Sequence, residues 1–401
     1  MRYIHYVAFG LLFLFLLFAG LTIWQWKTIS RFLEVAIETS KDGERTSPLK
    51  TPEDFLEYIV AHPQNVSLVA YEISNPEQGI FYRADEKHPL ASTIKILILA
   101  EYARQVEQGI ISPDEKIDLN SVDVYYLPNK DGGAHPQALK EFQDKKYVNA
   151  ANQIDLRHIA WAMIRYSSNA ATDYLIERLG RENIEKLPSR LGLPNQDVPL
   201  PIIGQFLSWD DSEISPLPAE RLKIYQAMSQ TEYANLVYNL MSKWRNDAAF
   251  RDRKIKHLIE FIGIEDQQAM AQALNPGGTA KGYAQIMERI YTNSLISPAV
   301  SQIMREYLEW PMKNEPVREK FDALSAKGGS LPGIVTETMY AKRKNGERGR
   351  VVALFFENIP TGVWLQLMQT YAQQEFELKL LTDKQFFETV RQKLSVVARL
   401  V

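Results

Sequence analysis

Three short stretches of this chain carry residue types suited to nucleophilic chemistry. In chain order they are Ser92-Thr93-Ile94-Lys95, Ser167-Ser168-Asn169 and Lys327-Gly328-Gly329-Ser330. A serine hydroxyl is a poor nucleophile until a base removes its proton. A lysine buried beside other cations can lose its own proton and act as that base. Together the stretches predict a serine nucleophile that is served by lysine amines.

The first stretch is expected to open a buried helix. The residues after Ser92 are mostly apolar up to Gly109, which is typical of a helix that is covered on several faces. Lys95 lies three residues after Ser92 and therefore shares a face with it, and the helix dipole favours negative charge near the serine. The alternative is a serine that only caps the helix and a lysine that extends its amine into solvent.

The second stretch interrupts a helical segment with a short polar loop. Such a loop between two helices can face a cleft. Ser167 would pass a proton to a leaving nitrogen, and Asn169 would hydrogen-bond the substrate amide and Lys95. The alternative is that Asn169 caps the next helix.

The third stretch precedes strand-like residues and contains two adjacent glycines. Gly329 would let a ligand backbone approach the strand edge closely, and Lys327 would attract an anionic substrate. Backbone amides of this strand could stabilise an oxyanion together with the amide of Ser92. Taken alone, the stretch is more typical of a glycine-rich turn before a hairpin.

Composition excludes several other classes of function. The chain has 401 residues, of which 45% are hydrophobic, so it is a globular protein. Its net charge of −3 gives no basis for binding nucleic acid. The absence of cysteine excludes disulfides and thiolate metal sites, and no histidine pair has helical metal-ligand spacing. We therefore expect no metal and no cofactor.

The first residues contain a candidate membrane span. The run from Val7 to Trp24 is uncharged, rich in Leu and Phe, and just long enough to cross a bilayer. It lacks the small residues of a signal-peptide cleavage site, so we expect an uncleaved anchor over residues 1–27. A polar tether over residues 28–50 then leads to one folded domain over residues 51–401. The flanking charges alone do not favour export of this domain.

Strand-like segments near both ends flank a long helical middle. The segments are 66–73 and 79–84, joined by a turn at Asn75–Gln78, and 333–342 and 350–358, joined at Asn345-Gly346. Helices follow, the last with a capping box that starts at Thr382. This order predicts the α+β class: an antiparallel sheet built from both termini and flanked by helices, with an all-α lobe inserted between them.

With these motifs in place, the chain resembles the superfamily of serine β-lactamases and penicillin-binding proteins, in its class A β-lactamase-like branch, over roughly residues 51–400. The stretch from Arg165 to Thr172 is similar to the family pattern R-Y-S-D-N-x-A-A, and Tyr126-Leu127-Pro128 resembles the aromatic wall of the family's cleft. The order and spacing of the three motifs agree with the family as well.

The resemblance implies a role for each residue. Ser92 would be acylated, Lys95 would be its base and Ser167 would relay the proton. Asn169, Lys327, Gly329, Ser330 and Tyr126 would contact the substrate, with Lys327 anchoring a carboxylate and the amides of Ser92 and Ser330 forming the oxyanion hole.

Departures from the family pattern are expected to change the chemistry. Gly328 replaces the usual hydroxyl residue, although the hydroxyl of Ser330 shares its face of the strand and could compensate. Ser168 replaces an aspartate that mainly supports the loop. Residues 194–207 contain no glutamate to activate a deacylating water. In that region a helical insertion, about residues 208–275, could cover one side of the cleft or bind a partner.

Three functions stay open at this point. The first is a membrane-anchored serine hydrolase that acts through an acyl-enzyme on a β-lactam or a related amide. The second is a D,D-peptidase that acts on cell-wall peptides, and the third is an inactive binding module with the same fold. For an enzyme of this kind we expect a single-pass membrane protein whose folded domain is extracytoplasmic. The sequence does not indicate an oligomeric state.

Overall fold

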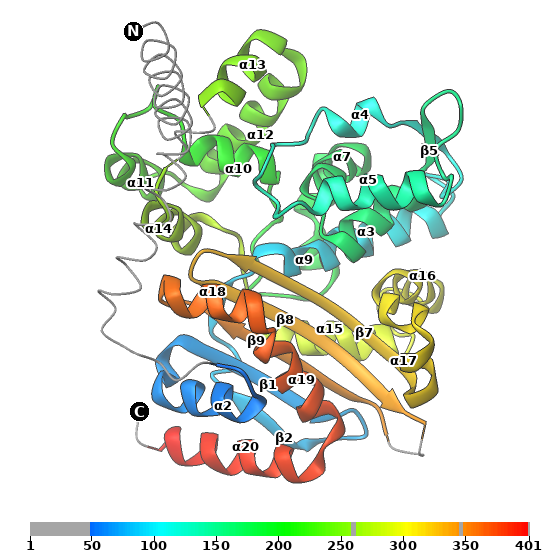
Figure 1. Cartoon of the computed structure of the whole chain (residues 1–401), viewed down its shortest axis with the longest axis vertical. Helices are drawn as coiled ribbons and strands as arrows, with labels where there is room; N and C mark the ends of the chain where they lie inside the picture. The colour runs from blue at the N-terminus through cyan, green and yellow to red at the C-terminus, as the bar shows by residue number, and fades with distance from the viewer. Residues whose placement is uncertain (1–48, 258–261, 345–347, 400–401) are drawn as a thin grey trace, which may run out of the picture.

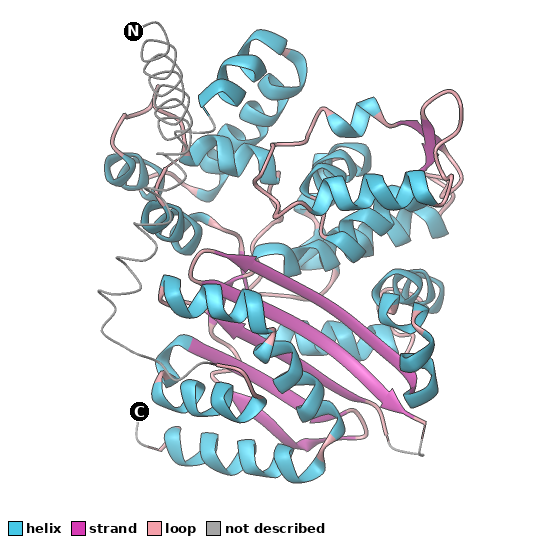
Figure 2. Cartoon of the chain, in the orientation of Figure 1, coloured by secondary structure: helices cyan, strands magenta, loops and turns pink. Residues whose placement is uncertain are grey.

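The protein folds around an antiparallel sheet with helices on both faces and a large helical lobe beyond one edge (Figures 1 and 2). The computed structural model describes residues 49–257, 262–344 and 348–399. None of the helices within these ranges has both the length and the apolar character needed to cross a bilayer. The anchor expected over residues 1–27 lies outside the described residues.

The strands are β1 Val66–Glu72, β2 Asn75–Tyr82, β3 Lys87–Pro89, β4 Lys116–Asp118, β5 Gln153–Asp155, β6 Gly277–Thr279, β7 Phe321–Leu331, β8 Ile334–Arg343 and β9 Arg350–Phe356. The main sheet has the order β2-β1-β9-β8-β7, so a strand from the N-terminal part pairs with strands from the C-terminal part. The predicted α+β class and the sheet built from both termini are therefore confirmed.

The longer helices are α2 Pro52–Ala61, α3 Lys95–Glu107, α5 Ala134–Asp144, α7 Asn169–Leu179, α10 Ile202–Trp209, α11 Pro218–Gln226, α12 Gln230–Asn246, α13 Ala248–His257, α14 Ile264–Leu274, α15 Ala280–Tyr291, α16 Pro298–Leu308, α18 Thr361–Thr370, α19 Ala372–Thr382 and α20 Lys384–Val397. Shorter helices are α4 Asn120–Asp123, α6 Leu156–Trp161, α8 Arg181–Glu185, α9 Leu187–Arg190 and α17 Glu315–Lys320, with single turns η1 Pro63–Asn65, η2 Ala91–Ile94, η3 Ala162–Tyr166 and η5 Trp310–Lys313.

The central strands β1 and β9 are mostly apolar and are buried along almost their whole length because helices cover both faces of the sheet. Neighbouring residues of β9 illustrate this, since their side chains point to opposite faces. The ring of Phe356 packs edge-on against Phe55 of α2 at 6.2 Å between centroids. The ring of Phe355 packs against Tyr283 of α15 at 5.4 Å. Figure 1 shows α2, α19 and α20 together on the first of these faces.

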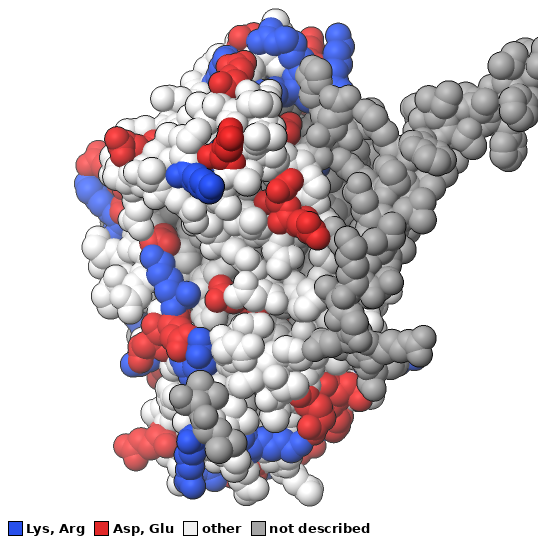
Figure 3. All heavy atoms as spheres, turned by 90° about the vertical axis from the view of Figure 1, so that its left-hand side faces the viewer, with Lys and Arg blue, Asp and Glu red and all other residues white. Residues whose placement is uncertain are grey.

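The helical lobe packs around two apolar centres. One surrounds α3, whose residues from Lys95 to Ala103 are all buried, as expected for a helix that is apolar on most sides. The other joins α10 to α14 around Trp209 and Trp244. This second group contains the helices of the expected insertion. On the face shown in Figure 3, acidic and basic side chains are interspersed among uncharged ones.

The structure corrects two local predictions. The first hairpin turns at residues 73–74 and not at Asn75–Gln78, because β2 begins at Asn75 and pairs with Glu72. Pro76 is tolerated there because β2 is an edge strand, where a missing N–H leaves no broken ladder bond. The second hairpin is confirmed by the antiparallel pairing of β8 with β9, and its turn at Asn345-Gly346 lies outside the described residues.

The last helix is capped by Asp383 and not by Thr382. The Asp383 carboxylate accepts hydrogen bonds from the backbone amides of Gln385 and Phe386, at 2.9 and 3.0 Å. The Thr382 hydroxyl instead donates to the carbonyl of Leu378 within the preceding helix. A carboxylate next to the first helical turn also interacts favourably with the helix dipole.

We predict that Asp383→Ala lowers the free energy of unfolding by about 1 kcal/mol, the usual loss for an N-cap. The matched variant Thr382→Ala should cost less, because a hydroxyl that bonds its own helix backbone adds little stability. Urea denaturation of the two variants checks this. A larger loss for Thr382→Ala than for Asp383→Ala would contradict the assignment of the cap.

Candidate active site

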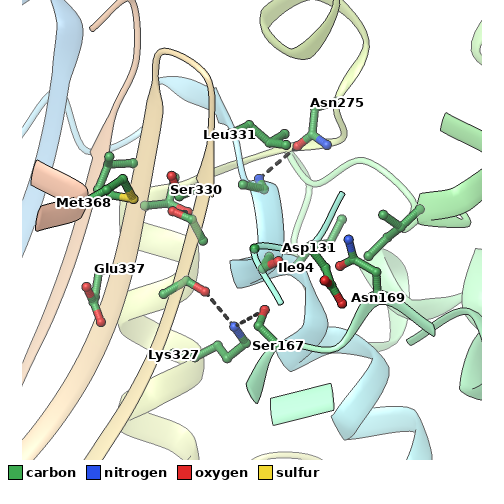
Figure 4. A pocket seen from close by; sticks show the side chains of 18 of the residues that line it. Ile94, Asp131, Ser167, Asn169, Asn275, Lys327, Ser330, Leu331, Glu337 and Met368 are labelled. Carbon is green, nitrogen blue, oxygen red and sulfur yellow. Dashed lines mark hydrogen bonds between the residues drawn. The ribbon is translucent and has the colours of Figure 1, made fainter. Parts of the chain in front are cut away.

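A cleft of about 950 Å³ lies where the free edge of β7 meets the start of α3 and the helical lobe. Its lining includes Ser92, Ser167, Asn169 and the stretch from Lys327 to Ser330, so the structure brings the three sequence motifs together. Figure 4 shows several of these side chains around the cleft. Lys95 lies beneath this lining and is fully buried.

Ser92 lies in the tight turn η2 that precedes α3. Ala91, just before it, has a left-handed backbone with φ of 46°, which costs energy for a residue with a side chain. The amide of Ala91 donates to Asn275 Oδ1 at 2.9 Å, and the carbonyl of Leu90 accepts from Thr336 Oγ1 at 2.7 Å. Contacts from two distant segments therefore fix Ser92 at the N-terminal end of α3.

The second motif also depends on a left-handed residue. Ser167 has φ of 66° and ends the π-helical turn η3. Ser168 is the N-cap of α7, since its hydroxyl accepts from the amide of Ala171 at 3.1 Å. The alternative that Asn169 serves as the cap is therefore wrong, and its side-chain amide is free to face the cleft.

Lys95 donates hydrogen bonds to this second motif. Its Nζ lies 2.6 Å from the carbonyl of Ser167, 3.1 Å from Ser167 Oγ and 2.8 Å from Asn169 Oδ1. Burial lowers the pKa of Lys95 well below the usual lysine value, and the charge of Lys327 lowers it further. The carboxylates of Asp173 and Asp131 oppose this shift only in part. Lys95 therefore loses its proton more readily than a lysine in water would.

Lys327 donates a hydrogen bond to the same hydroxyl. Its Nζ lies 3.1 Å from Ser167 Oγ and 2.6 Å from the carbonyl of Gly328. Burial lowers the pKa of Lys327 to about 8, although the carboxylate of Glu337 opposes the shift. Ser167 Oγ thus lies between two amines, at 3.1 Å from each.

The third motif lies within β7 and does not precede a strand as expected. Because Lys327 bonds the carbonyl of Gly328, that carbonyl points to the free edge of the sheet. Residues two apart in a strand direct their backbone groups to the same edge, so the amide of Ser330 also faces the cleft. This amide and that of Ser92 have the placement expected of oxyanion donors.

The Ser330 hydroxyl bonds Trp364 of α18. It accepts a hydrogen bond from Trp364 Nε1 at 2.8 Å on the α18 side of the strand. A Cβ added at Gly328, on the same face, would lie 3.2 Å from the carboxylate of Glu337. The space left by the missing side chain at residue 328 therefore borders Glu337, a residue that sequence reasoning missed.

Tyr126 does not contribute to the lining in this structure. Its ring packs against His135 at 5.1 Å between centroids, and the nearby lining comes from residues 129–132. The expected aromatic wall is replaced here by the polar residues Asn129, Lys130 and Asp131.

A buried histidine supports the second motif. His135 Nε2 lies 2.9 Å from Asp123 Oδ1, and His135 Nδ1 lies 2.9 Å from Ser168 Oγ. The Asp123 carboxylate accepts from Nε2–H, so in the neutral ring Nδ1 accepts from the Ser168 hydroxyl. Ser168 is fully buried, so its arrangement with Asp123 and His135 supports the loop and does not expose a nucleophile.

Two more supporting residues could not be found from the sequence. Asn275 reaches the Ser92 turn from a point 184 residues further along the chain. Asp173 is fully buried and accepts from the amides of Ile202 and Ile203 at 2.6 and 2.7 Å, which fixes α10 beside the cleft. Burial raises the pKa of Asp173 to about 7. Neither residue belongs to a recognisable local pattern.

Comparison with known proteins identifies the family of the chain. A family model described as the beta-lactamase enzyme family matches residues 52–362. The chain therefore belongs to the beta-lactamase enzyme family, within the superfamily of serine β-lactamases and penicillin-binding proteins. No curated protein matches the chain.

Several solved structures are similar at low sequence identity. A mutant of PBP-A, solved as an acyl-enzyme complex with penicillin G, is 16% identical, with 80% of this chain and 95% of that chain covered and a TM-score of 0.46. A β-lactamase from Sphaerobacter thermophilus is 15% identical, with 86% and 97% covered and a TM-score of 0.47. A carbapenemase from Vibrio cholerae is 13% identical, with 80% and 98% covered and a TM-score of 0.45.

The approach of β7 to the Ser92 turn can be tested by two neighbouring substitutions. A Cβ at Gly329 would lie 2.5 Å from the backbone nitrogen of Ser92, whereas a Cβ at Gly328 meets only the end of a side chain. Gly329→Ala should therefore lower the free energy of unfolding by about 1–3 kcal/mol, as overpacking does. The matched variant Gly328→Ala should cost clearly less. Thermal and urea unfolding measure both, and equal costs would argue against the close approach.

Proposed function

We propose that this protein is a serine hydrolase that is acylated on Ser92 by a β-lactam or a related peptide amide and that releases the acyl group slowly. The observation that carries this proposal is the Ser167 hydroxyl, which lies 3.1 Å from the Nζ atoms of both Lys95 and Lys327 beside the Ser92 turn. A hydroxyl between two amines can accept a proton from one side and deliver it on the other.

The acylation step follows from this arrangement. The free amine of Lys95 takes the proton of the Ser92 hydroxyl, and Ser92 Oγ forms a bond to the substrate carbonyl carbon. The amides of Ser92 and Ser330 stabilise the negative oxygen of the tetrahedral intermediate. As the carbon–nitrogen bond breaks, the proton passes from Lys95 through Ser167 to the leaving nitrogen.

The residues around the cleft favour slow deacylation. Among the described residues that line it, only Asp131 and Glu337 carry carboxyl groups. The Asp131 oxygens already accept from the amides of Gly133 and His135, and Glu337 lies on the far face of β7. Neither is arranged to activate a water on the acyl-enzyme. This supports a penicillin-binding, peptidase-like activity over rapid β-lactam hydrolysis.

We also propose that residues 1–27 anchor the protein in a membrane with its folded domain on the extracytoplasmic side. The apolar run from Val7 to Trp24 is the support for this proposal. Membrane fractionation of the full chain, compared with a chain that begins at Leu49, tests it. Equal recovery of both chains in the soluble fraction would contradict an anchor.

The acyl-enzyme can be observed directly. We predict that a fluorescent penicillin labels the native protein on Ser92 and that the label persists for hours. Ser92→Ala should abolish the labelling, whereas Ser74→Ala, at an exposed turn far from the cleft, should not change it. Intact-mass spectrometry and gel fluorescence measure the adduct and its lifetime. Rapid loss of the label would favour a β-lactamase, and no adduct at all would favour an inactive binding module.

The pH dependence of acylation tests the role of Lys95. Since Lys95 acts as a free base, acylation should slow as the pH falls and Lys95 becomes protonated. The charge of Lys327 helps to keep the pKa of Lys95 low. Lys327→Gln should therefore raise the pKa of Lys95 and shift the acidic limb of the rate profile to higher pH. A shift to lower pH would contradict this role, whereas Lys281→Gln, at an exposed site, should leave the profile unchanged.

A further inference from the structure

The cleft continues past β7 onto the face of the sheet that carries α18 and α19. Gly328 and Glu337 are cross-strand partners and share this face, whereas the Lys327 side chain points to the opposite one. In Figure 4, Glu337 and Met368 lie to the left of Ser330, and Lys327 and Ser167 lie to its right. Because residue 328 is a glycine, no side chain at this position separates Glu337 from the cleft.

This compartment offers mainly hydrogen-bond acceptors. Glu337 is only 4% exposed and lines the cleft. Gln373, which is 2% exposed and also lines the cleft, has an Oε1 atom with no hydrogen-bond partner among the described residues. Glu377 lies behind them, fully buried, and neither of its carboxyl oxygens has a partner there. Buried acceptors are usually satisfied, so the Gln373 oxygen beside Glu337 is arranged for a donor that arrives with the ligand. Burial raises the pKa of Glu377, which does not line the cleft.

The charges in this compartment disfavour an anion. Lys327 is the positive group that would anchor a substrate carboxylate. Burial raises the pKa of Glu337 to about 7 and the charge of Lys327 opposes this rise, so Glu337 in its ionised form offsets the charge of Lys327 from across the strand. Lys327 also directs its hydrogen bonds to Ser167 and to the carbonyl of Gly328. A carboxylate near Gly328 would lie beside Glu337 and gain little from Lys327.

We propose that the part of the cleft lined by Gly328, Glu337 and Gln373 is a specificity subsite that takes a cationic, hydrogen-bond-donating group such as an ammonium on the leaving side of the substrate. This rests on the proposed function, because Ser167 protonates the leaving group and Lys327 bonds both Ser167 and Gly328. The leaving side of the substrate therefore lies beside Gly328. A carboxylate at that position is the disfavoured substituent, so a penicillin, which carries one beside its leaving nitrogen, should acylate Ser92 more slowly than a cationic substrate.

The test uses three thioesters with the same acyl group and different leaving thiols. The thiols carry a dimethylammonium, a carboxamide or a carboxylate. In acylation, Ser92 Oγ bonds to the carbonyl carbon, the carbon–sulfur bond breaks, and the thiol leaves with the proton that Ser92 lost. We expect kcat/KM for the cationic thioester to exceed that for the carboxylate by about tenfold, the effect of one charge-assisted hydrogen bond.

Glu337→Gln keeps the size of the side chain and removes its charge. It should bring the ratio of kcat/KM for the cationic thioester to that for the carboxylate thioester close to one, with the carboxamide thioester measured beside them as the neutral reference. The matched control Glu306→Gln removes an exposed carboxylate on α16 and should not alter the ratio. Should Glu337→Gln fail to fold in a thermal melt, Gly328→Ala decides the matter, because its methyl group would lie 3.2 Å from the Glu337 carboxyl and should lower the ratio.

Two outcomes overturn the subsite and are distinct from failure of the proposed function. In the first, the native protein turns over the carboxylate thioester as well as the cationic one. In the second, Glu337→Gln changes all three substrates by the same factor, which would make Glu337 only a structural counter-ion for Lys327. If no thioester and no fluorescent penicillin acylates Ser92, the proposed function itself is wrong.

Discussion

The rest of the site depends on two lysine side chains that are buried on either side of one serine hydroxyl. Lys95 and Lys327 each place Nζ 3.1 Å from Ser167 Oγ, and neither is more than 4% exposed. Two ammonium groups in such a position repel each other and lose their hydration, so the protein favours a state in which at least one is neutral. Burial lowers the pKa of both amines; the charge of Lys327 lowers that of Lys95 further, whereas Glu337 opposes the shift of Lys327, so we assign Lys95 as the base. The chemistry that we propose follows from this difference between two residues of the same type.

The fold holds this arrangement by bringing together segments that are far apart in the chain. The edge strand β7 supplies Lys327, the start of α3 supplies Lys95, and the turn before α7 supplies Ser167. Both serine turns contain a left-handed residue, Ala91 and Ser167, and such strain persists only where the surroundings fix it. Hydrogen bonds from Asn275 and Thr336 fix the first turn, and the cap at Ser168 with its His135 contact fixes the second. Glycine at residue 329 then allows β7 to approach the Ser92 turn closely.

Sequence patterns predicted those parts of the structure that local chemistry determines. The apolar runs predicted the strands from both termini, and the three motifs predicted which residues meet in the cleft. The predicted turn at Asn75–Gln78 was wrong. It relied on the strong turn preference of Pro76, but an edge strand also tolerates proline. The residues that support the site were not predicted for another reason. Asn275, His135 and Glu337 act through contacts that form only in the folded chain, and a single Asn, His or Glu has no local sequence pattern. The same limit applies to Tyr126, whose motif suggested a cleft wall but whose ring packs against His135.

The most direct test of the account is the charge of Lys95 at neutral pH. In protein with ¹³C-labelled lysine side chains, NMR titration of the Cε resonance reports protonation of each amine, and Lys95→Met assigns the signal. We predict that Lys95 titrates well below the lysines of the surface while the native fold persists. A Lys95 resonance that titrates with the ordinary lysines of the surface would show that the amine is charged in the resting protein, and it would contradict the proposed base.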